Sequence, residues 1–159
     1  MLDSLSSRAL VALAAAGSAA VLIAALIFQA AGFAPCDLCI AQRWPHLAAV
    51  LIGAAMLAFR LPARLAWAGA AAAATTGGIA VYHSLVERKL IAGPASCTSS
   101  GPGTLSAEDL LAQIQSAPLI RCDEIAVQIL GVTMPNMNVL ASALFAALWV
   151  AAALKARRG

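Results

Sequence analysis

The chain has 159 residues, of which 62% are hydrophobic and only 11% are charged, and its formal net charge is +3. A soluble domain carries about 25% charged residues, so this composition and the mean hydropathy of +0.89 indicate a membrane protein. The small net charge and the lack of a basic run with interleaved aromatic residues exclude a protein that binds nucleic acid.

Four long stretches with few charges are predicted to cross the membrane as helices. They cover residues 10–30, 40–59, 65–84 and 136–154. Each approaches the roughly 20 residues that span a bilayer. The first is longer than the apolar region of a secretory signal, which has about 7–15 residues, so we interpret it as a transmembrane helix. Pro45 is expected in the first turn of the second helix, where proline is tolerated.

The positions of lysine and arginine predict the orientation of these spans. In a four-span arrangement one side of the membrane carries Arg8, Arg60, Arg64, Lys155, Arg157 and Arg158. The positive-inside rule therefore places both termini in the cytoplasm and all four cysteines on the outer side. In a bacterium that side is the oxidising periplasm, where disulfides persist. We expect an all-α protein of the bacterial inner membrane, with residues 1–159 forming one four-transmembrane-helix bundle.

A long periplasmic loop is expected over residues 85–135. Glycine and proline on either side of Cys97 predict turns. Ser106 has the character of an N-cap and predicts a short surface helix over residues 107–116. A second apolar piece over residues 125–130 is expected to dip to the membrane interface without crossing it.

Four cysteines allow three disulfide pairings, and their spacing favours two of the possible pairs. A disulfide between Cys36 and Cys39 would be small, strained and readily reduced. A disulfide between Cys97 and Cys122 would close a loop of ~25 residues, a size at which a disulfide stabilises a fold appreciably. The cross pairings stay open, and an electron relay would need one of them transiently.

The Cys36-x-x-Cys39 pair lies at the start of the second span, with Arg43 one helical turn later. The positive end of the helix and the arginine both stabilise a thiolate, which is the reactive form of cysteine. A structural role is disfavoured because a two-residue spacing constrains little chain. Arg43 alone would fit an interfacial arginine facing lipid headgroups. Beside the two thiols, we predict that it donates a hydrogen bond to a quinone carbonyl.

The histidines and a possible metal leave alternatives open. His83 is either an interfacial hydrogen-bonding residue or a proton shuttle to a reduced quinone. Glu87, one turn further on, either orients His83 or is solvated. A structural interpretation is favoured for His46. A zinc site built from four thiolates usually brings two CxxC pairs, and this chain has one, so no metal is expected.

An ordered set of motifs resembles the bacterial DsbB family, the disulfide bond formation proteins B, in its shorter branch. The motifs are Pro35-Cys36-x-x-Cys39-x-x-x-Arg43, Tyr82-His83, Gly93-Pro94-x-x-Cys97, Cys122-Asp-Glu, and Leu130-Gly131-x-x-Met134-Pro135 with Asn138. The resemblance covers nearly the whole chain. The CxxC pair alone is a weak motif, and the order of the whole set is specific.

The resemblance implies a thiol:quinone oxidoreductase that supports disulfide bond formation. The partner would be a periplasmic thiol oxidase similar to DsbA, and the cofactor would be a membrane quinone, ubiquinone rather than menaquinone. Cys97 would form the mixed disulfide with that partner, and Cys122 would then attack Cys36. Cys39 would be released to face the quinone, with Arg43 and His83 as the quinone-binding residues. DsbA, DsbB and quinone together keep the bacterial periplasm oxidising.

Two other interpretations are weighed against this one. A membrane scaffold with two structural disulfides would keep its cysteines oxidised whatever the partner or quinone. A relative that runs in the reducing direction, similar to vitamin K epoxide reductase, fits less well because the CxxC pair lies early in the chain, on the second span.

Overall fold

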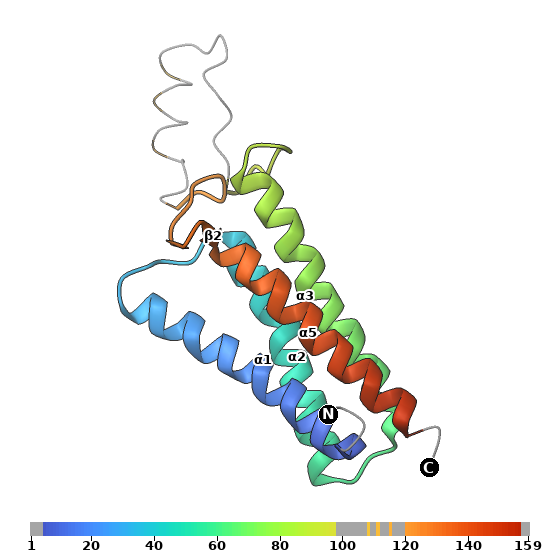
Figure 1. Cartoon of the computed structure of the whole chain (residues 1–159). Helices are drawn as coiled ribbons and strands as arrows, with labels where there is room; N and C mark the ends of the chain where they lie inside the picture. Colours follow the sequence, from blue (N-terminus) through green and yellow to red (C-terminus); the bar gives the residue numbers. More distant parts are fainter. Residues whose placement is uncertain (1–4, 98–107, 109–110, 112–114, 116–119, 157–159) are drawn as a thin grey trace.

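Four long helices form the protein in a computed structural model, which describes residues 5–97, 108, 111, 115 and 120–156. The helices are α1 (Ser7–Ala30), α2 (Asp37–Ala58), α3 (Ala66–Glu87) and α5 (Met134–Lys155), shown in Figure 1. A short 3-10 turn, η2 (Ala63–Leu65), precedes α3. Each long helix, α3 together with η2, is apolar enough to cross a membrane. The predicted all-α, four-helix membrane fold is therefore confirmed.

The helices pack as an up-and-down bundle in which α1 and α3 each contact both α2 and α5. The start of α1 and the end of α5 lie at one end of the bundle (Figure 1). The four cysteines lie at the other end, which we call the cysteine end. Toward this end α1 leans away from the other helices (Figure 1). This divergence leaves room for a cavity that α1 and α5 both line, as described below.

The second helix begins earlier than the sequence predicted. Cys36 is its N-cap, and the Cys36 sulfur accepts a hydrogen bond from the backbone N–H of Cys39 at 3.2 Å. Pro45 therefore lies inside α2, and the expectation that it falls in the first turn is wrong. Proline removes the backbone donor that would have paired with the Ala41 carbonyl. The helix continues because its neighbours in the bundle hold it.

Small residues allow the helices to approach closely at the end opposite the cysteines. A Cβ atom at Gly69 of α3 would overlap the indole ring of Trp149 from α5, and one at Gly53 would overlap the Cβ of Ala15. Trp149 is fully buried. Lipid tails are as apolar as these side chains, so van der Waals packing between helices, rather than water exclusion, stabilises this core.

The segment before α5 forms a small hairpin. Strands β1 (Gln128–Ile129) and β2 (Val132–Thr133) pair antiparallel, and Leu130 and Gly131 both have positive φ in the turn between them. Two left-handed residues are the mark of a tight hairpin turn. The expected apolar piece over 125–130 therefore ends in a strand and a turn. The predicted surface helix over 107–116 lies outside the described residues, except for Glu108, Leu111 and Gln115.

Candidate active site

The two cysteines of the CxxC pair lie in the first turn of α2 with their sulfurs facing each other. The Sγ atoms of Cys36 and Cys39 are 2.7 Å apart, and both residues are free thiols in this structure. Cys36 is buried and Cys39 is half-buried. The hydrogen bond that Cys36 shares with Cys39, together with burial, raises the pKa of the Cys36 thiol.

The other two cysteines form the disulfide that their spacing favoured. Cys97 and Cys122 are bonded, with Cα atoms 5.3 Å apart, and the backbone N–H of Cys122 donates to the Cys97 carbonyl at 2.7 Å. Only 1% of Cys97 and none of Cys122 is exposed. The glycine and proline residues around Cys97 predicted turns and gave no indication of this burial.

All four cysteines belong to one buried cluster. Cys36, Cys97 and Cys122 pack with Leu38 of α2 and Val86 of α3, and Cys39 lies against them. Cys36 and Cys122, which are more than 80 residues apart in the sequence, thus lie in the same cluster. The two sulfur pairs therefore lie in one cluster.

His83 faces the CxxC pair, and its tautomer follows from the hydrogen bonds of Gln42. The Gln42 Nε2 group donates to the Leu38 carbonyl at 3.0 Å, which fixes the orientation of the amide. The same nitrogen donates to His83 Nδ1 at 2.9 Å, so Nδ1 is an acceptor. The ring proton is therefore on Nε2, which lies 3.6 Å from the Cys36 sulfur and also interacts with the Cys122 backbone.

The Gln42 side chain continues a buried polar network across three helices. Its Oε1 accepts from Asn138 Nδ2 at 2.7 Å, and Asn138 Oδ1 accepts from His46 Nε2 at 2.9 Å. Thr76 of α3 donates to the Gln42 backbone carbonyl at 3.0 Å. Buried polar groups at membrane depth are costly, so such a network is expected to serve a function. The sequence did not reveal Gln42 as a site residue. Asn138 was noted there only as part of the motifs that resemble the DsbB family.

Cys36, Cys39 and His83 offer three possible metal ligands within 4.8 Å of one another. A histidine binds a metal through a nitrogen that carries a lone pair. The nitrogen of His83 that faces Cys36 carries the proton, because Nδ1 accepts from Gln42. The arrangement therefore suits a hydrogen bond to sulfur better than coordination of a metal ion.

A cavity of about 300 Å³ opens beside Cys39, between α1, α2 and α5. Its wall is mainly apolar, with Phe28 and Phe33 on one side and Met137 on the other. The polar groups come from Cys39, Gln42, Arg43, His46 and Asn138. The volume lies at the lower end of the roughly 300–1,000 Å³ range of small-molecule sites. An apolar pocket with a thiol and a guanidinium at its edge suits a flat, polar-edged ring.

The remaining residues singled out from the sequence are placed as follows. Arg43 donates to Gln29 Oε1 at 2.7 Å at the edge of the cavity. His83 does not line the cavity, whereas His46 does, and no described residue is a hydrogen-bond partner of His46 Nδ1. Glu87 is buried beside Thr133 and forms no hydrogen bond with His83 among the described residues.

An ion pair brackets Cys122 on the outside of the cluster. The Arg121 guanidinium donates two hydrogen bonds to the carboxylate of Asp123, at 3.0 and 2.7 Å. These hydrogen bonds hold the pKa of Asp123 below its ordinary value and raise the pKa of Arg121. This ion pair, the Arg121–Asp123 fork, links the side chains of the two residues that flank Cys122.

Comparison with known proteins agrees with this arrangement. The family described as disulfide bond formation protein DsbB matches residues 7–152. This range contains all four cysteines and all four helices, except for the last residues of α5. The uncharacterized protein RP370 of Rickettsia prowazekii (strain Madrid E) is 31% identical over 121 residues, covering 74% of this chain and 69% of that protein. No solved structure matches the chain. The chain therefore belongs to the DsbB family, and it is a multi-pass membrane oxidoreductase of disulfide bond formation.

Proposed function

We propose that this protein is a quinone-dependent dithiol oxidase that reoxidises a periplasmic partner similar to DsbA. One observation carries the proposal: a disulfide and a dithiol are packed into a single buried cluster, and the dithiol borders a cavity at membrane depth. The cluster provides a path for an electron pair from a water-soluble partner to a group dissolved in the lipid.

The first step oxidises the partner. A thiolate of the reduced partner attacks Cys97, the Cys97–Cys122 bond breaks, and Cys122 leaves as a thiolate. The partner's second thiol then attacks the mixed disulfide, so that the partner leaves oxidised and Cys97 and Cys122 are both reduced. Because Cys97 is buried, this exchange requires that its segment open first.

The second step moves the electron pair inward. With Cys36 and Cys39 joined as a disulfide, the Cys122 thiolate attacks Cys36 and Cys39 leaves. Cys97 then attacks Cys122, which restores the Cys97–Cys122 disulfide and leaves Cys36 and Cys39 reduced. The described arrangement of one disulfide and one dithiol corresponds to this stage of the cycle.

The residues around the cavity fit a quinone. Its apolar wall suits the ring and prenyl tail, and Arg43 at the edge suits a ring carbonyl. His46 Nδ1, buried without a partner among the described residues, is a free acceptor in the same wall, which suits a hydroxyl of the reduced ring and not a quinone carbonyl. A bound quinone supplies an acceptor for two electrons and two protons. Ubiquinone rather than menaquinone remains the expected species.

His83 is assigned to the dithiol in this scheme. Its Nε2–H group faces the Cys36 sulfur and can donate a hydrogen bond to a thiolate there. This group would stabilise Cys36 when it loses its proton during closure of the Cys36–Cys39 bond. The predicted contact of His83 with quinone stays a prediction.

The arrangement of charges supports a location in the bacterial inner membrane with the cysteine end in the periplasm. Arg8, Arg60 and Arg64 lie at the opposite end of the bundle, as the positive-inside rule requires of the cytoplasmic face. Thiol-labelling with a membrane-impermeant reagent in spheroplasts and in inverted vesicles checks this orientation.

A coupled assay tests the function. The purified protein in lipid nanodiscs is mixed with a reduced dithiol partner and a soluble ubiquinone analogue, and thiol loss and quinone reduction are followed together. We expect one quinone to be reduced for each dithiol oxidised. Cys39→Ser should abolish quinone reduction, and Cys97→Ser should abolish partner oxidation. Thiol loss without quinone reduction would refute the proposal.

A second candidate function is a membrane scaffold held by a structural disulfide. The burial of Cys97 and Cys122 favours it, because an inaccessible disulfide resists exchange. The two functions differ in cells that lack quinone. An electron relay accumulates reduced Cys36 and Cys39 there, whereas a scaffold keeps the same cysteine state with and without quinone.

A further inference from the structure

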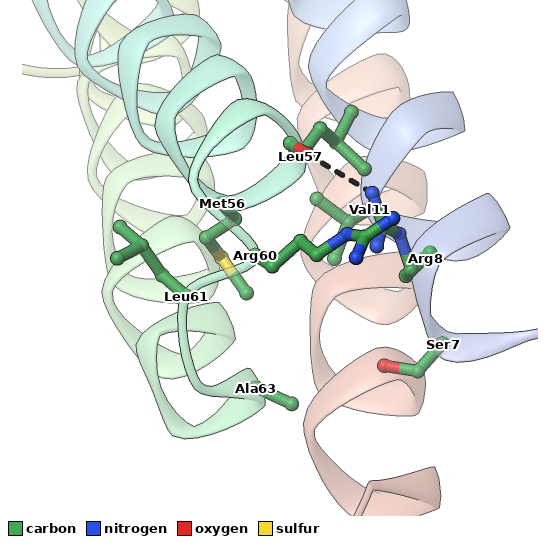
Figure 2. A pocket seen from close by; sticks show the side chains of 8 residues that line it. All are labelled: Ser7, Arg8, Val11, Met56, Leu57, Arg60, Leu61 and Ala63. Atoms are coloured by element: carbon green, nitrogen blue, oxygen red, sulfur yellow. Dashed lines mark hydrogen bonds between the residues drawn. The ribbon is translucent and has the colours of Figure 1, made fainter.

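A second cavity, of about 110 Å³, lies at the end of the bundle opposite the cysteines (Figure 2). It is formed by the first turns of α1, the last turn of α2 and the chain that follows α2. Its volume is several times what one water molecule requires. Two arginines line it, Arg8 from α1 and Arg60 from the segment after α2. Val11 and Met56 form an apolar floor beside them.

The two arginines are held differently. Arg8 Nη2 donates to the Leu57 carbonyl at 3.0 Å and so satisfies one of the free carbonyls at the end of α2. Arg60 has a φ of +51°, a left-handed conformation that is uncommon for residues other than glycine, asparagine and aspartate. Figure 2 shows the Arg60 side chain extending across the cavity toward Arg8.

The Arg60 guanidinium lacks a counter-charge in the part of the chain that the structure describes. No described residue forms a hydrogen bond or ion pair with the Arg60 guanidinium. The described acidic residues all belong to the cysteine end or to the segment between α3 and α5: Asp37, Glu87, Glu108, Asp123 and Glu124. Two cations directed into one cavity repel each other, and a bound anion removes that repulsion.

We propose that this cavity binds a phosphate group, supplied by the headgroup of an anionic phospholipid. Guanidinium groups present paired N–H donors that match phosphate oxygens. The cavity lies where α1 begins and α2 ends, which is the level of the headgroups for helices of this length. Phe59, beside Arg60, is 75% exposed and provides apolar surface for the lipid chains. Basic pockets between transmembrane helices are known sites for anionic headgroups.

The positive-inside rule alone does not account for this arrangement. That rule requires only that cations lie on one side of the membrane, and Arg64 satisfies it without lining the cavity. It does not explain why the Arg60 side chain extends toward a second arginine (Figure 2). The left-handed backbone of Arg60 has another cause, because it ends α2 with a hydrogen bond from the Leu61 N–H to the Met56 carbonyl at 3.2 Å. Arg64 is therefore the matched control: the same residue type, four positions along the chain and outside the cavity.

Lipid binding to the whole protein tests the proposal. Mass spectrometry of the intact protein in a neutral detergent measures the affinities for phosphatidylglycerol and for phosphatidylcholine with the same acyl chains. We expect phosphatidylglycerol to bind more tightly, and Arg60→Asn to weaken its binding about tenfold or more. Asparagine tolerates the left-handed conformation, so this variant removes the guanidinium without adding backbone strain. Arg64→Gln should leave the affinity within about twofold, since Arg64 does not line the cavity.

Three outcomes would overturn the proposal. Equal affinity for the two lipids would show that the cavity does not recognise the anionic headgroup. Equal loss in Arg60→Asn and Arg64→Gln would assign the preference to the general surface charge. Competition by inorganic phosphate at the same concentration as the lipid would assign the site to free phosphate and not to lipid. The thiol oxidation of Arg60→Asn in detergent should equal that of the unaltered protein, because the cavity lies at the end opposite the cysteines.

Discussion

Among the single residues of the site, Gln42 determines which ring nitrogen of His83 carries the proton. The Leu38 carbonyl fixes the amide, the amide donates to Nδ1, and Nε2–H is left to face Cys36. A histidine in the other tautomer would present a lone pair to the sulfur and could not stabilise a thiolate there. Gln42 is thus a positioning residue that acts through His83.

Replacing Gln42 by methionine tests that role. Gln42→Met keeps the length of the side chain and removes its hydrogen bonds to Leu38, His83 and Asn138, so both His83 tautomers become populated. Nitrogen-15 NMR of labelled histidine should change from one Nε2–H species to a mixture. Closure of the Cys36–Cys39 bond should slow about tenfold, equivalent to about 1.4 kcal/mol.

Gln29→Met is the control for that experiment, because Gln29 bonds to Arg43 and lies outside the His83 network. It should leave the histidine spectrum unchanged. A Gln42→Met spectrum with a single Nε2–H species would contradict the assigned role.

Arg43 is expected to affect quinone binding more than partner oxidation. Arg43→Gln removes the charge at the edge of the cavity while keeping a hydrogen-bond donor. A hydrogen bond to a charged group contributes about 1.5–3 kcal/mol, so KM for the quinone analogue should rise about tenfold or more. The KM for the reduced partner should not change. A rise in the partner KM alone would place Arg43 outside the quinone site.

The fork between Arg121 and Asp123 predicts a dependence on pH. The pKa of Asp123 is lowered, so the fork is intact at neutral pH and is lost as the pH falls through that lowered value. Protonation of a phosphine slows its attack on any disulfide, so the rate is measured relative to that of a small-molecule disulfide at the same pH. The relative rate of reduction of the Cys97–Cys122 disulfide should be constant above pH 3.8, the ordinary carboxyl value, and rise below it. The increase should be small, since both partners are near the surface.

Asp123→Asn should show the faster reduction already at neutral pH. Glu124→Gln is the matched control, because Glu124 makes one longer contact with Arg121, at 3.3 Å, and is 67% exposed at its side chain. Equal rates in Asp123→Asn and in the unaltered protein at neutral pH would show that the fork does not hold the Cys122 segment.

The residues of the site were only partly predictable from the sequence. The cysteines and Arg43 could be found because spacing and position carry their chemistry. Gln42 was not found, since its role depends on a contact with His83, 41 residues away. The burial of Cys97 was not predicted either, because glycine and proline around it report local turns and not what packs over them.

At the scale of elements, hydropathy and charge were sufficient to predict all four helices. Their ends depended on local contacts: the Cys36 cap starts α2 before the predicted residue 40, and Leu130-Gly131 makes a hairpin turn that the apolar pattern did not indicate. The close helix packing also depends on particular glycines, which composition alone does not place opposite a partner such as Trp149.

Two glycines of α3 provide a matched test of that packing. A methyl group at Gly69 would overlap the Trp149 ring, whereas one at Gly78 meets no atom within 4 Å. Gly69→Ala should lower the free energy of unfolding by about 1–3 kcal/mol, as overpacking of a core does. Gly78→Ala should be neutral or slightly stabilising. The unfolding midpoint in a detergent and denaturant titration measures both, and similar values for the two variants would contradict the packing described here.

At the scale of the whole molecule, the bundle separates two tasks between its ends. The cysteine end contains the sulfur cluster, the polar network and the larger cavity, while the opposite end contains the close α3–α5 packing and the paired arginines. The rigid end fixes the helices from which Cys36, Cys39 and His83 project. The Cys97–Cys122 disulfide lies outside the four helices, in the part of the chain between α3 and the β1–β2 hairpin.

The exchange of electrons between the two sulfur pairs is the central claim, and a trapping experiment tests it most directly. In the double variant Cys39→Ser with Cys97→Ser, only Cys36 and Cys122 remain. If their sulfurs meet during the cycle, mild oxidation of the protein in nanodiscs should give a Cys36–Cys122 disulfide, identified by peptide mass spectrometry. Folded protein in which both thiols stay free, or pair only between molecules, would contradict the proposed path.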